Sequence, residues 1–389
     1  MIDNKKNQSK IAIIELVGAY GGMEIYDLSI MDGLSQNLNT IHLYTTNYFS
    51  KLRGVDFDKV KMIFGEIYSK DRCRLIRYFM VILGFVRLVK ALVKNRYHIK
   101  YCHIFTYSFL ELMVVIVSTV GGGRVFVNIH DPKPFMNKSN WLIKKIFYLI
   151  FRGQRFNIVT HSKYSREILL TNYPEVPVNV MPHTDIDYLY VPAQCPVWES
   201  KKVLQLNIEK KYLLFFGQIK KNKGLDILIQ AFADTGIAGK GYSLLIAGRC
   251  WGEEWSDYQK LIEENSLSED VVVVNSFIEP ENVYHYFNSA QFVVLPYTEI
   301  FSSGVLIRAA GYGKPVICSD LPAFLEEIVD GENGIVFQSG NVSALAGALS
   351  AATVSPDTAD MMSYQVIEKY SKKYDRFNVA ERMIMVFNS

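Results

Sequence analysis

Short apolar runs alternate with helix-length segments along almost the whole chain of 389 residues. Such runs, bounded by polar turns, are typical of buried strands, and the segments between them are typical of the helices of βαβ units. Seven runs in the first half fit this pattern: 11–16, 40–46, 60–65, 101–105, 124–129, 156–160 and 178–182. They predict one doubly wound parallel sheet.

The second half repeats the pattern. Its apolar runs lie at 212–217, 242–248, 271–275, 291–296, 315–319 and 334–337. They predict a second Rossmann-like sheet, and 389 residues is a length that suits two domains.

A proline-containing stretch without clear periodicity separates the halves, so we place a linker near 185–208. The sequence therefore predicts an α/β fold of two doubly wound domains, 1–187 and 208–365, which face each other across a cleft. A charged helix over about 366–389 is expected to pack back on the first domain.

Composition narrows the class of protein. The chain is 49% hydrophobic and 21% charged, which is typical of a globular protein. Five cysteines without ligand spacing predict neither disulfides nor a zinc site, and a polar N-terminus without a following signal peptide favours the cytoplasm. The most apolar window, 110–120, is too short to span a membrane and contains Glu111, so we expect a buried helix there.

One segment has the context of an anion site. The stretch YTEIFSSGVLIRAAGYGKPV (297–316) follows a predicted strand, and its SSG precedes a predicted helix. The free backbone amides of Ser303, Gly304 and Val305 at the start of that helix would attract a phosphate group. The alternative is a simple turn in which Ser302 or Ser303 caps the helix.

A second segment is expected at the same edge of the sheet. In FFGQIKKNKGLDILIQAF (215–232) a strand ends at Gly217, and Lys220, Lys221 and Lys223 follow before an amphipathic helix. Lysines at the carboxyl end of a parallel strand suit a phosphate ligand. The alternative is a solvated basic loop, which is the commoner fate of lysines.

Taken in order, these segments resemble the GT-B glycosyltransferases of the retaining family 4 type, also called glycosyl transferases group 1. The resemblance covers most of the chain, and the ordered set is more specific than any member. The motifs are VGAYGGMEIYDL, NIHDPKPF, THSKYSREIL, MPH, FFG...KG, LLIAG, FIEPENVYHYFNSAQFVVLPY and SGV...A...GKPVI.

The resemblance implies a role for each matching residue. The residues implied for the donor diphosphate are Lys223, Gln218, Ser303, Gly304 and Val305. Those implied for the nucleobase and ribose are Phe277, Ile278 and Glu299. Those implied for the loop near donor and acceptor are Gly21 and Gly22, and those beside the reacting sugar are His130 and Asp131. No metal is implied.

Two positions depart from the family pattern. Gln218 stands where an arginine usually accompanies the lysine, and Arg308 stands where a glutamate usually holds the ribose. Arg308 could supply part of the missing positive charge, but we favour a solvent-facing or structural role. A lost charged hydrogen bond costs ~1.5–3 kcal/mol, which weakens donor binding without abolishing it.

Two other motifs are set aside. Asp185 to Asp187 spell Asp-Ile-Asp, a metal–nucleotide motif of another glycosyltransferase fold, but they lie at the linker, so we expect no metal. The first glycine-rich loop lacks the G-x-G-x-x-G spacing, which disfavours a nicotinamide dehydrogenase.

The function implied is the retaining transfer of a sugar from a UDP- or GDP-linked donor to a saccharide acceptor, without a cofactor or nucleic acid. In this reading His130 positions the sugar and stabilises the transition state. The alternatives are an inactive partner subunit and a sugar-nucleotide epimerase of the same fold.

Charge adds a possible membrane partner. Residues 1–190 carry a net +10 and the remainder −7, and nine basic residues fall between Lys70 and Lys100 around the apolar centre 78–86. Such a helix can lie on an anionic bilayer, or it can be a core-packed helix with a basic solvent edge. A lipid-diphosphate-linked acceptor, as in bacterial surface-polysaccharide assembly, would explain the charge and predicts peripheral association with the inner face of the membrane.

Overall fold

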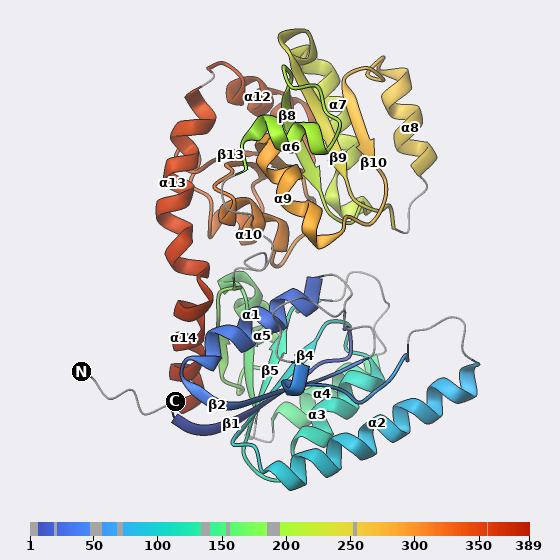
Figure 1. Cartoon of the computed structure of the whole chain (residues 1–389), viewed down its shortest axis with the longest axis vertical. Helices are drawn as coiled ribbons and strands as arrows, with labels where there is room; N and C mark the ends of the chain where they lie inside the picture. The colour runs from blue at the N-terminus through green and yellow to red at the C-terminus, as the bar shows by residue number, and fades with distance from the viewer. Residues whose placement is uncertain are drawn as a thin grey trace. The chain divides into compact units, whose positions relative to one another are not determined.

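The chain folds into two units (Figure 1). The first holds Met1–Ile186 together with Tyr374–Ser389, and the second holds Asp187–Lys373. The structure is a computed structural model that describes residues 7–18, 22–46, 57–67, 73–133, 141–152, 156–184, 195–251, 255–355 and 357–389.

The first unit is built on a parallel sheet of seven strands in the order β3-β2-β1-β4-β5-β6-β7. The strands are β1 (Asn7–Ile14), β2 (Leu38–Thr45), β3 (Val60–Met62), β4 (Ile99–Ile104), β5 (Arg124–Ile129), β6 (Phe156–Thr160) and β7 (Val178–Val180). Each predicted run forms a strand, so the expected doubly wound sheet is confirmed.

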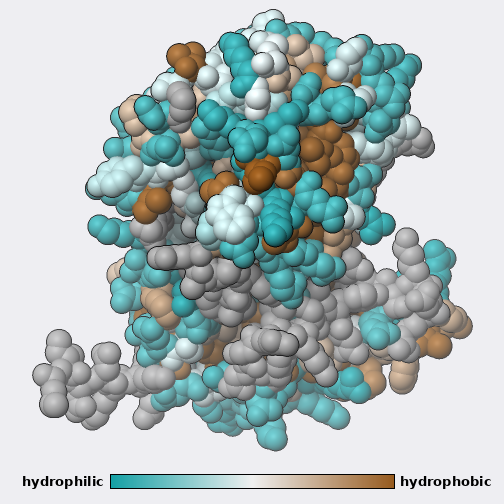
Figure 2. Space-filling model, turned by 45° about the horizontal axis from the view of Figure 1, so that its top comes forward, coloured by the Kyte–Doolittle hydropathy of each residue, from teal (hydrophilic) through white to brown (hydrophobic). Residues whose placement is uncertain are grey.

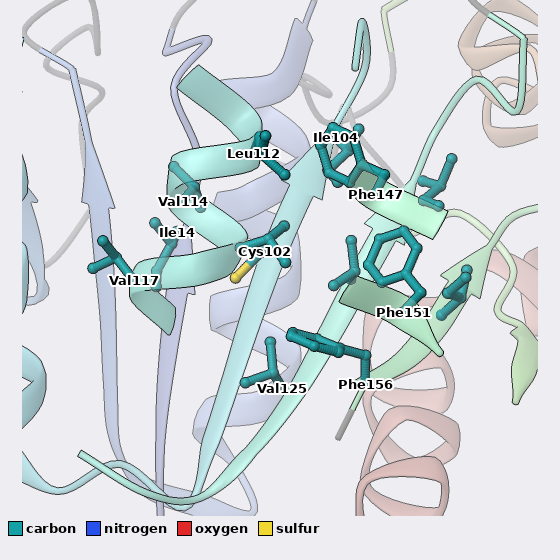
Figure 3. Packing of buried hydrophobic residues seen from close by; sticks show 14 of the residues in the cluster. Ile14, Cys102, Ile104, Leu112, Val114, Val117, Val125, Phe147, Phe151 and Phe156 are labelled. Atoms are coloured by element: carbon teal, nitrogen blue, oxygen red, sulfur yellow. The ribbon is translucent and has the colours of Figure 1, made fainter. Parts of the chain in front are cut away.

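Helices cover both faces of this sheet. They are α1 (Met23–Ser35), α2 (Arg74–Asn95), α3 (Phe109–Ser118), α4 (Trp141–Phe151) and α5 (Lys163–Asn172). Side chains of α2 to α5 join one buried cluster with β1, β4, β5 and β6, and Figure 3 shows Leu112 of α3 and Phe147 of α4 pointing into it. The helix expected over 110–120 is α3, which begins with a capping box between Ser108 and Glu111.

The opposite face is covered by α1 and by α14 (Arg376–Asn388). Phe387 of α14 packs on the rings of Tyr101 and Phe126, with centroids 5.9 and 4.8 Å apart. Arg376 pairs with Asp32 of α1 through an Nε–Oδ2 contact of 2.5 Å. The last helix of the chain therefore completes the first unit.

The second unit has a parallel sheet of six strands in the order β10-β9-β8-β11-β12-β13. The strands are β8 (Lys211–Phe216), β9 (Tyr242–Ala247), β10 (Val271–Val274), β11 (Ala290–Leu295), β12 (Val316–Ser319) and β13 (Gly334–Phe337). The prediction of a second Rossmann-like sheet is confirmed.

Its helices also form two layers. They are α6 (Val197–Val203), α7 (Leu225–Thr235), α8 (Trp255–Glu264), α9 (Pro280–Ser289), α10 (Gly304–Gly311), α11 (Pro322–Leu325), α12 (Val342–Ala352) and α13 (Asp357–Tyr374). The helices α7, α8, α12 and α13 share one buried cluster with the sheet. On the other face Phe287 of α9 packs on Phe216 of β8, with ring centroids 4.9 Å apart.

Strand order locates a switch point in each sheet. In the first unit the connections run outward in both directions from the β1–β4 pair, and in the second from the β8–β11 pair. At such a point the two connections lead to opposite faces of the sheet, and ligands of open α/β sheets bind in the crevice outside the strand ends. The carboxyl ends of these two pairs are therefore where functional residues are expected.

Candidate functional site

In the second unit, the loops that follow β8 and β11 touch at the switch point. The backbone amide of Thr298 donates to the carbonyl oxygen of Asn222 at 2.9 Å. Gly224 has φ +64°, and a Cβ there would lie 2.0 Å from the carbonyl oxygen of Pro296. Only glycine permits this approach, so the two predicted phosphate segments are held side by side.

Helix α10 begins at this point. Ser303 is its N-cap, and its hydroxyl accepts the amide hydrogen of Leu306 at 3.2 Å. The cap therefore leaves the first-turn amides of Gly304 and Val305 for another acceptor. The helix-cap reading of Ser303 is correct and is compatible with an anion site, because one cap satisfies only one of the orphan donors.

Lys223 connects the two loops. It ends the short 3-10 helix Lys221–Lys223, and its Nζ lies 3.7 Å from the ring centroid of the buried Tyr297. A hydrogen bond links the side chains of Tyr297 and Ser303. The cation and the start of α10 are thus joined through one aromatic ring.

The other residues predicted to bind the sugar donor lie farther from Lys223 and the start of α10 or are more exposed. Gln218 lies two residues after the end of β8 and is exposed. Glu299 is also exposed, and its backbone carbonyl oxygen accepts a hydrogen bond from Asn222 Nδ2 at 3.4 Å. Phe277 is exposed and Ile278 half-buried, both after the edge strand β10. They share an edge of the sheet with Lys223, two strands away from β8.

Of the two positions that the sequence favoured for Arg308, solvent or a structural ion pair, the structure does not show the first. Arg308 is half-buried, and its guanidinium carbon lies 5.9 Å from the ring centroid of Phe216, the last residue of β8. Its positive charge is therefore near the carboxyl end of the central strand.

In the first unit, histidines gather at the ends of neighbouring strands. They are His103 in β4, His130 after β5, His161 after β6 and His183 after β7. The ring of Tyr26 from α1 lies among all four, with centroid distances of 5.8, 5.5, 5.7 and 5.0 Å in that order. His130 also stacks on Phe105, 4.3 Å away.

Burial keeps these imidazoles neutral. It lowers the pKa of His103 and of His161 to about 4. Burial, together with the neighbouring histidines, holds the pKa of His130 and His183 well below the usual range. Each ring therefore offers one donor and one acceptor nitrogen at neutral pH.

Two buried carboxyls lie in the same region. Glu15, directly after β1, accepts hydrogen bonds from the amides of Val17 and Gly18 and from the Thr45 hydroxyl. Burial and the neighbouring Asp27 raise the pKa of Glu15 to about 7. Burial raises the pKa of Asp27 well above its usual range, and its Oδ1 lies 3.2 Å from His103 Nε2.

Within the described residues, three of these histidines form the one group of side chains close enough together to be considered as ligands of a metal ion. One ring nitrogen from each of His130, His161 and His183 lies within 4.8 Å of the others. Tetrahedral zinc with bonds of about 2.0–2.1 Å needs its nitrogens about 3.4 Å apart. The rings of His161 and His183 nearly stack, 4.1 Å apart at 32°, so an ion would require them to rearrange.

Residues 196–369, which include the two touching loops, match the sequence profile of a family described as glycosyl transferases group 1. This segment belongs to that family. It contains nearly all of the second unit, so this unit is a group 1 glycosyltransferase domain.

Curated relatives of the group 1 domain act in several pathways. The chain is 24% identical over 184 residues to the lipopolysaccharide core biosynthesis mannosyltransferase LpsB of Rhizobium meliloti, covering 46% of this chain and 51% of LpsB. It is 23% identical over 240 residues to a lipopolysaccharide 1,2-N-acetylglucosaminetransferase of Salmonella typhimurium, covering 58% of this chain and 60% of that relative. The chain thus matches about half the length of these relatives.

Solved structures resemble both units. Sucrose-phosphate synthase from Thermosynechococcus elongatus has a TM-score of 0.78 at 17% identity, covering 98% of each chain. Anabaena HepE, in complex with UDP and glucose, has a TM-score of 0.76 at 15% identity, covering 98% of this chain and 100% of HepE. These likenesses confirm the GT-B fold of two Rossmann-like domains outside as well as inside the group 1 domain.

Sequence reasoning missed most of the first-unit cluster. His161, His183 and Asp27 stood inside motifs of the resemblance but were assigned no role. Glu15 and His103 lay in predicted strands and were assigned none either. The signal shared by His130, His161 and His183 is position, because each follows a predicted strand and parallel strands end at one edge. Gly22 caps α1 with φ 83°, whereas Gly21 and the Asp185–Asp187 motif lie outside the described residues.

Proposed function

We propose that this protein transfers a sugar from a nucleotide-sugar donor to a saccharide acceptor, with retention of the anomeric configuration. The observation that carries the proposal is the joined pair of loops at the β8–β11 switch point. There Lys223 and the N-cap residue of α10, Ser303, both contact Tyr297 within a group 1 glycosyltransferase domain.

The proposed chemistry depends on charge. As the sugar C1–oxygen bond to the diphosphate breaks, negative charge grows on the leaving phosphate oxygen. A lysine and two helix amides stabilise that charge without reorganising. The acceptor oxygen forms its bond to C1 on the same face, and the acceptor's proton passes to the leaving phosphate oxygen. His130 of the first unit is proposed to contact the sugar, with Asp131 next to it.

Arg308 is proposed to compensate for the departure at Gln218. Its guanidinium lies over Phe216 at the end of β8, two residues before Gln218 in the chain. A cation there strengthens the positive field at the strand end where the family pattern would place an arginine. Glu299 and the post-β10 residues Phe277 and Ile278 are proposed to hold the nucleoside.

We propose a lipid-linked acceptor in bacterial surface-polysaccharide assembly. The names of two relatives support this pathway, since they refer to lipopolysaccharide core biosynthesis and to capsular polysaccharide biosynthesis. Helix α2 supports the lipid linkage. It carries exposed apolar side chains at helical spacing, and these are Leu75, Tyr78, Phe79, Ile82, Val86 and Val93.

Exposed basic residues flank that apolar stripe. They are Arg74, Arg87, Lys90 and Lys94. Hydrophobic and hydrophilic side chains lie side by side at the lower right of Figure 2, where α2 projects in Figure 1. Within the described ranges, no helix is both long and apolar enough to cross a membrane. We propose that α2 lies on an anionic bilayer surface in a cytoplasmic protein.

Nucleotide-sugar binding tests the transfer proposal. We expect one member of a panel of UDP- and GDP-sugars, at ~100 times its dissociation constant, to stabilise the protein by ~2.7 kcal/mol. Replacing Lys223 by alanine removes a charged hydrogen bond and should weaken that donor's binding by about 10- to 150-fold, as measured by calorimetry.

Lys221→Ala is the matched control, since Lys221 is exposed in the same 3-10 turn. Equal losses in the two variants, or no stabilisation by any nucleotide sugar, would contradict the proposal. Binding of a nucleotide sugar without release of its nucleotide, whichever acceptor is added, would favour an inactive partner subunit. Conversion of the donor sugar into its epimer would favour an epimerase.

A further inference from the structure

Three histidines of the first unit reach one edge of its sheet from neighbouring strands. His130 directly follows β5, His161 directly follows β6, and His183 comes three residues after the end of β7. These strands are adjacent in the sheet, and adjacent strands lie about 4.8 Å apart. The fold therefore brings together three imidazoles that the sequence places in separate motifs.

Hydrogen bonds of the main chain hold these strand ends in place. The amide of His130 donates to the carbonyl oxygen of Ile104 at 3.1 Å, and the amide of Met181 donates to the carbonyl oxygen of Thr160 at 2.8 Å. The hydroxyl of Thr160 donates to the carbonyl oxygen of Ile129 at 3.1 Å. The backbone around the histidines is thus fixed before any ligand binds, which reduces the entropy lost on binding.

The ring of His161 has a defined tautomer. Its Nδ1 lies 3.0 Å from the carbonyl oxygen of Met181, and a carbonyl oxygen only accepts, so Nδ1 carries the hydrogen. The lone pair of this neutral ring is therefore on Nε2. His161 is only 8% exposed, and among the described residues its Nε2 has no hydrogen-bond partner. A buried acceptor without a partner is costly, which indicates a ligand at this nitrogen.

His183 presents a second nitrogen of this kind. Its Nδ1 is also buried and has no hydrogen-bond partner within the part of the chain that the structure describes. One ring nitrogen from each of His130, His161 and His183 lies within 4.8 Å of the others. A hydroxyl group would satisfy only one of these nitrogens, whereas a metal cation accepts lone pairs from all three. Imidazole is a preferred ligand of zinc and of its neighbours in the first transition series.

The surroundings of His161 suit a metal ligand. A metal-bound histidine usually donates the hydrogen of its other ring nitrogen to a carboxylate or a backbone carbonyl, as His161 does to Met181. The nitrogens must still approach each other, because the limit of 4.8 Å exceeds the spacing at tetrahedral zinc by about 1.4 Å. His183 is half-buried, so its ring has room on the solvent side to turn away from the stack with His161.

We propose that His130, His161 and His183 form a binding site for one divalent transition-metal cation. Zn²⁺ is the expected occupant, with a water or ligand oxygen in the fourth position. The ion inhibits transfer instead of assisting it, because a metal-bound His130 cannot contact a sugar. This inhibition rests on the proposed function, whereas the binding of the ion does not.

Titration of the metal-free, full-length protein with Zn²⁺ or Co²⁺ tests the site without any substrate. Calorimetry should show one ion per chain, and bound Co²⁺ should give the intense visible absorption of a four-coordinate ion. His183→Ala should weaken binding about 100-fold or more, since loss of a group that only supports a ligand already costs 10- to 100-fold. His161→Phe should do the same while keeping an aromatic ring.

His98→Ala is the matched control, because His98 is exposed and outside the cluster. It should leave the affinity for both ions unchanged. If His161→Phe does not fold, the half-buried His183 still provides the test. Absence of binding to the wild-type protein, an unchanged affinity in His183→Ala, or an equal loss in His98→Ala would each overturn the proposal.

Turnover provides a separate measurement. Zn²⁺ should inhibit transfer with a midpoint near its dissociation constant, a chelator should restore activity, and His183→Ala should shift the midpoint by the same factor as the affinity. Inhibition that His183→Ala does not shift would place the ion on the nucleotide diphosphate and overturn the inhibitory role. Binding of the ion by a protein without transferase activity would leave the metal site standing and refute the proposed function alone.

Discussion

The buried histidines of the first unit are titratable groups that folding holds in one charge state. His161 is a clear case, because its Nδ1 is 3.0 Å from the carbonyl oxygen of Met181 and its ring packs between His130 and His183. Burial lowers its pKa to about 4, whereas an unfolded chain titrates near 6.5. Its protonation is therefore linked to folding.

His161→Phe should change the pH dependence of stability. As the pH falls below about 6.5, His161 is protonated in the unfolded chain but stays neutral in the folded chain. The wild-type protein therefore loses stability until the pH reaches about 4. The loss at pH 5 is about 2 kcal/mol for this histidine, and phenylalanine removes it. Urea unfolding of both proteins from pH 7.5 to 5 measures the difference.

The buried carboxyl of Glu15 changes stability with pH in the opposite direction, but it does not affect the difference between the two proteins. Glu15 has a raised pKa, so it contributes stability as the pH falls, but it is present in both proteins and largely cancels. A wild-type minus variant difference that stays constant with pH would show that His161 is not held neutral by folding.

Residues of the second unit were predictable where a local motif coincides with a strand end. Lys223 and Ser303 each lie a few residues beyond an apolar run, so both position and chemistry were visible in the sequence. Asp27 and His103 were not, because their contact joins α1 to β4 across 75 intervening positions. No short-range pattern records such a contact.

At the scale of elements, apolar runs predicted every strand of the described residues. The signal has its clearest cause in β4 and β9, which are buried along their whole length and therefore need a continuous apolar sequence. The charged tail was harder. It forms two helices, and the break comes at Asp375, whose side chain caps α14 by accepting from the amides of Phe377 and Asn378. Capping depends on local geometry, so periodicity alone did not separate α13 from α14.

The stripe on α2 gives a prediction at this scale. We expect the protein to sediment with anionic vesicles at low salt and to be released by salt. Phe79→Ser together with Ile82→Ser removes two exposed apolar side chains and should weaken binding without affecting the fold. Arg87→Ala or Lys90→Ala should each cost about 1 kcal/mol, or about fivefold.

Met361→Ser with Ile367→Ser on α13 is the matched control, because both side chains are also exposed on a helix. Binding to neutral vesicles as strong as to anionic ones would contradict the electrostatic part of the proposal. Lys100, counted with the basic stretch from sequence, is fully buried in β4 and is not expected to contribute.

At the scale of the whole molecule, the return of α14 to the first unit makes the two units separable in experiment. Phe387→Ala removes a buried ring that packs on Tyr101 and Phe126 and should cost about 3–5 kcal/mol. Hydrogen exchange followed by mass spectrometry should show faster exchange in peptides of residues 7–184 and unchanged exchange in 195–373.

Met385→Ala is the control, since Met385 is exposed on the same helix. Equal loss of protection in both units after Phe387→Ala would mean that they unfold as one cooperative body. It would also mean that stabilisation by a nucleotide cannot be assigned to the second unit from unfolding data alone.

The discontinuous first unit also orders events during synthesis. A ribosome adds residues from the N-terminus onward, so the whole of 187–373 is made before α14 exists. The second unit can fold while the sheet of the first still exposes Tyr101 and Phe126 on the face that α14 will cover. A nascent chain paused after Lys373 should therefore be a strong client of chaperones, and binding of α14 should end that interaction.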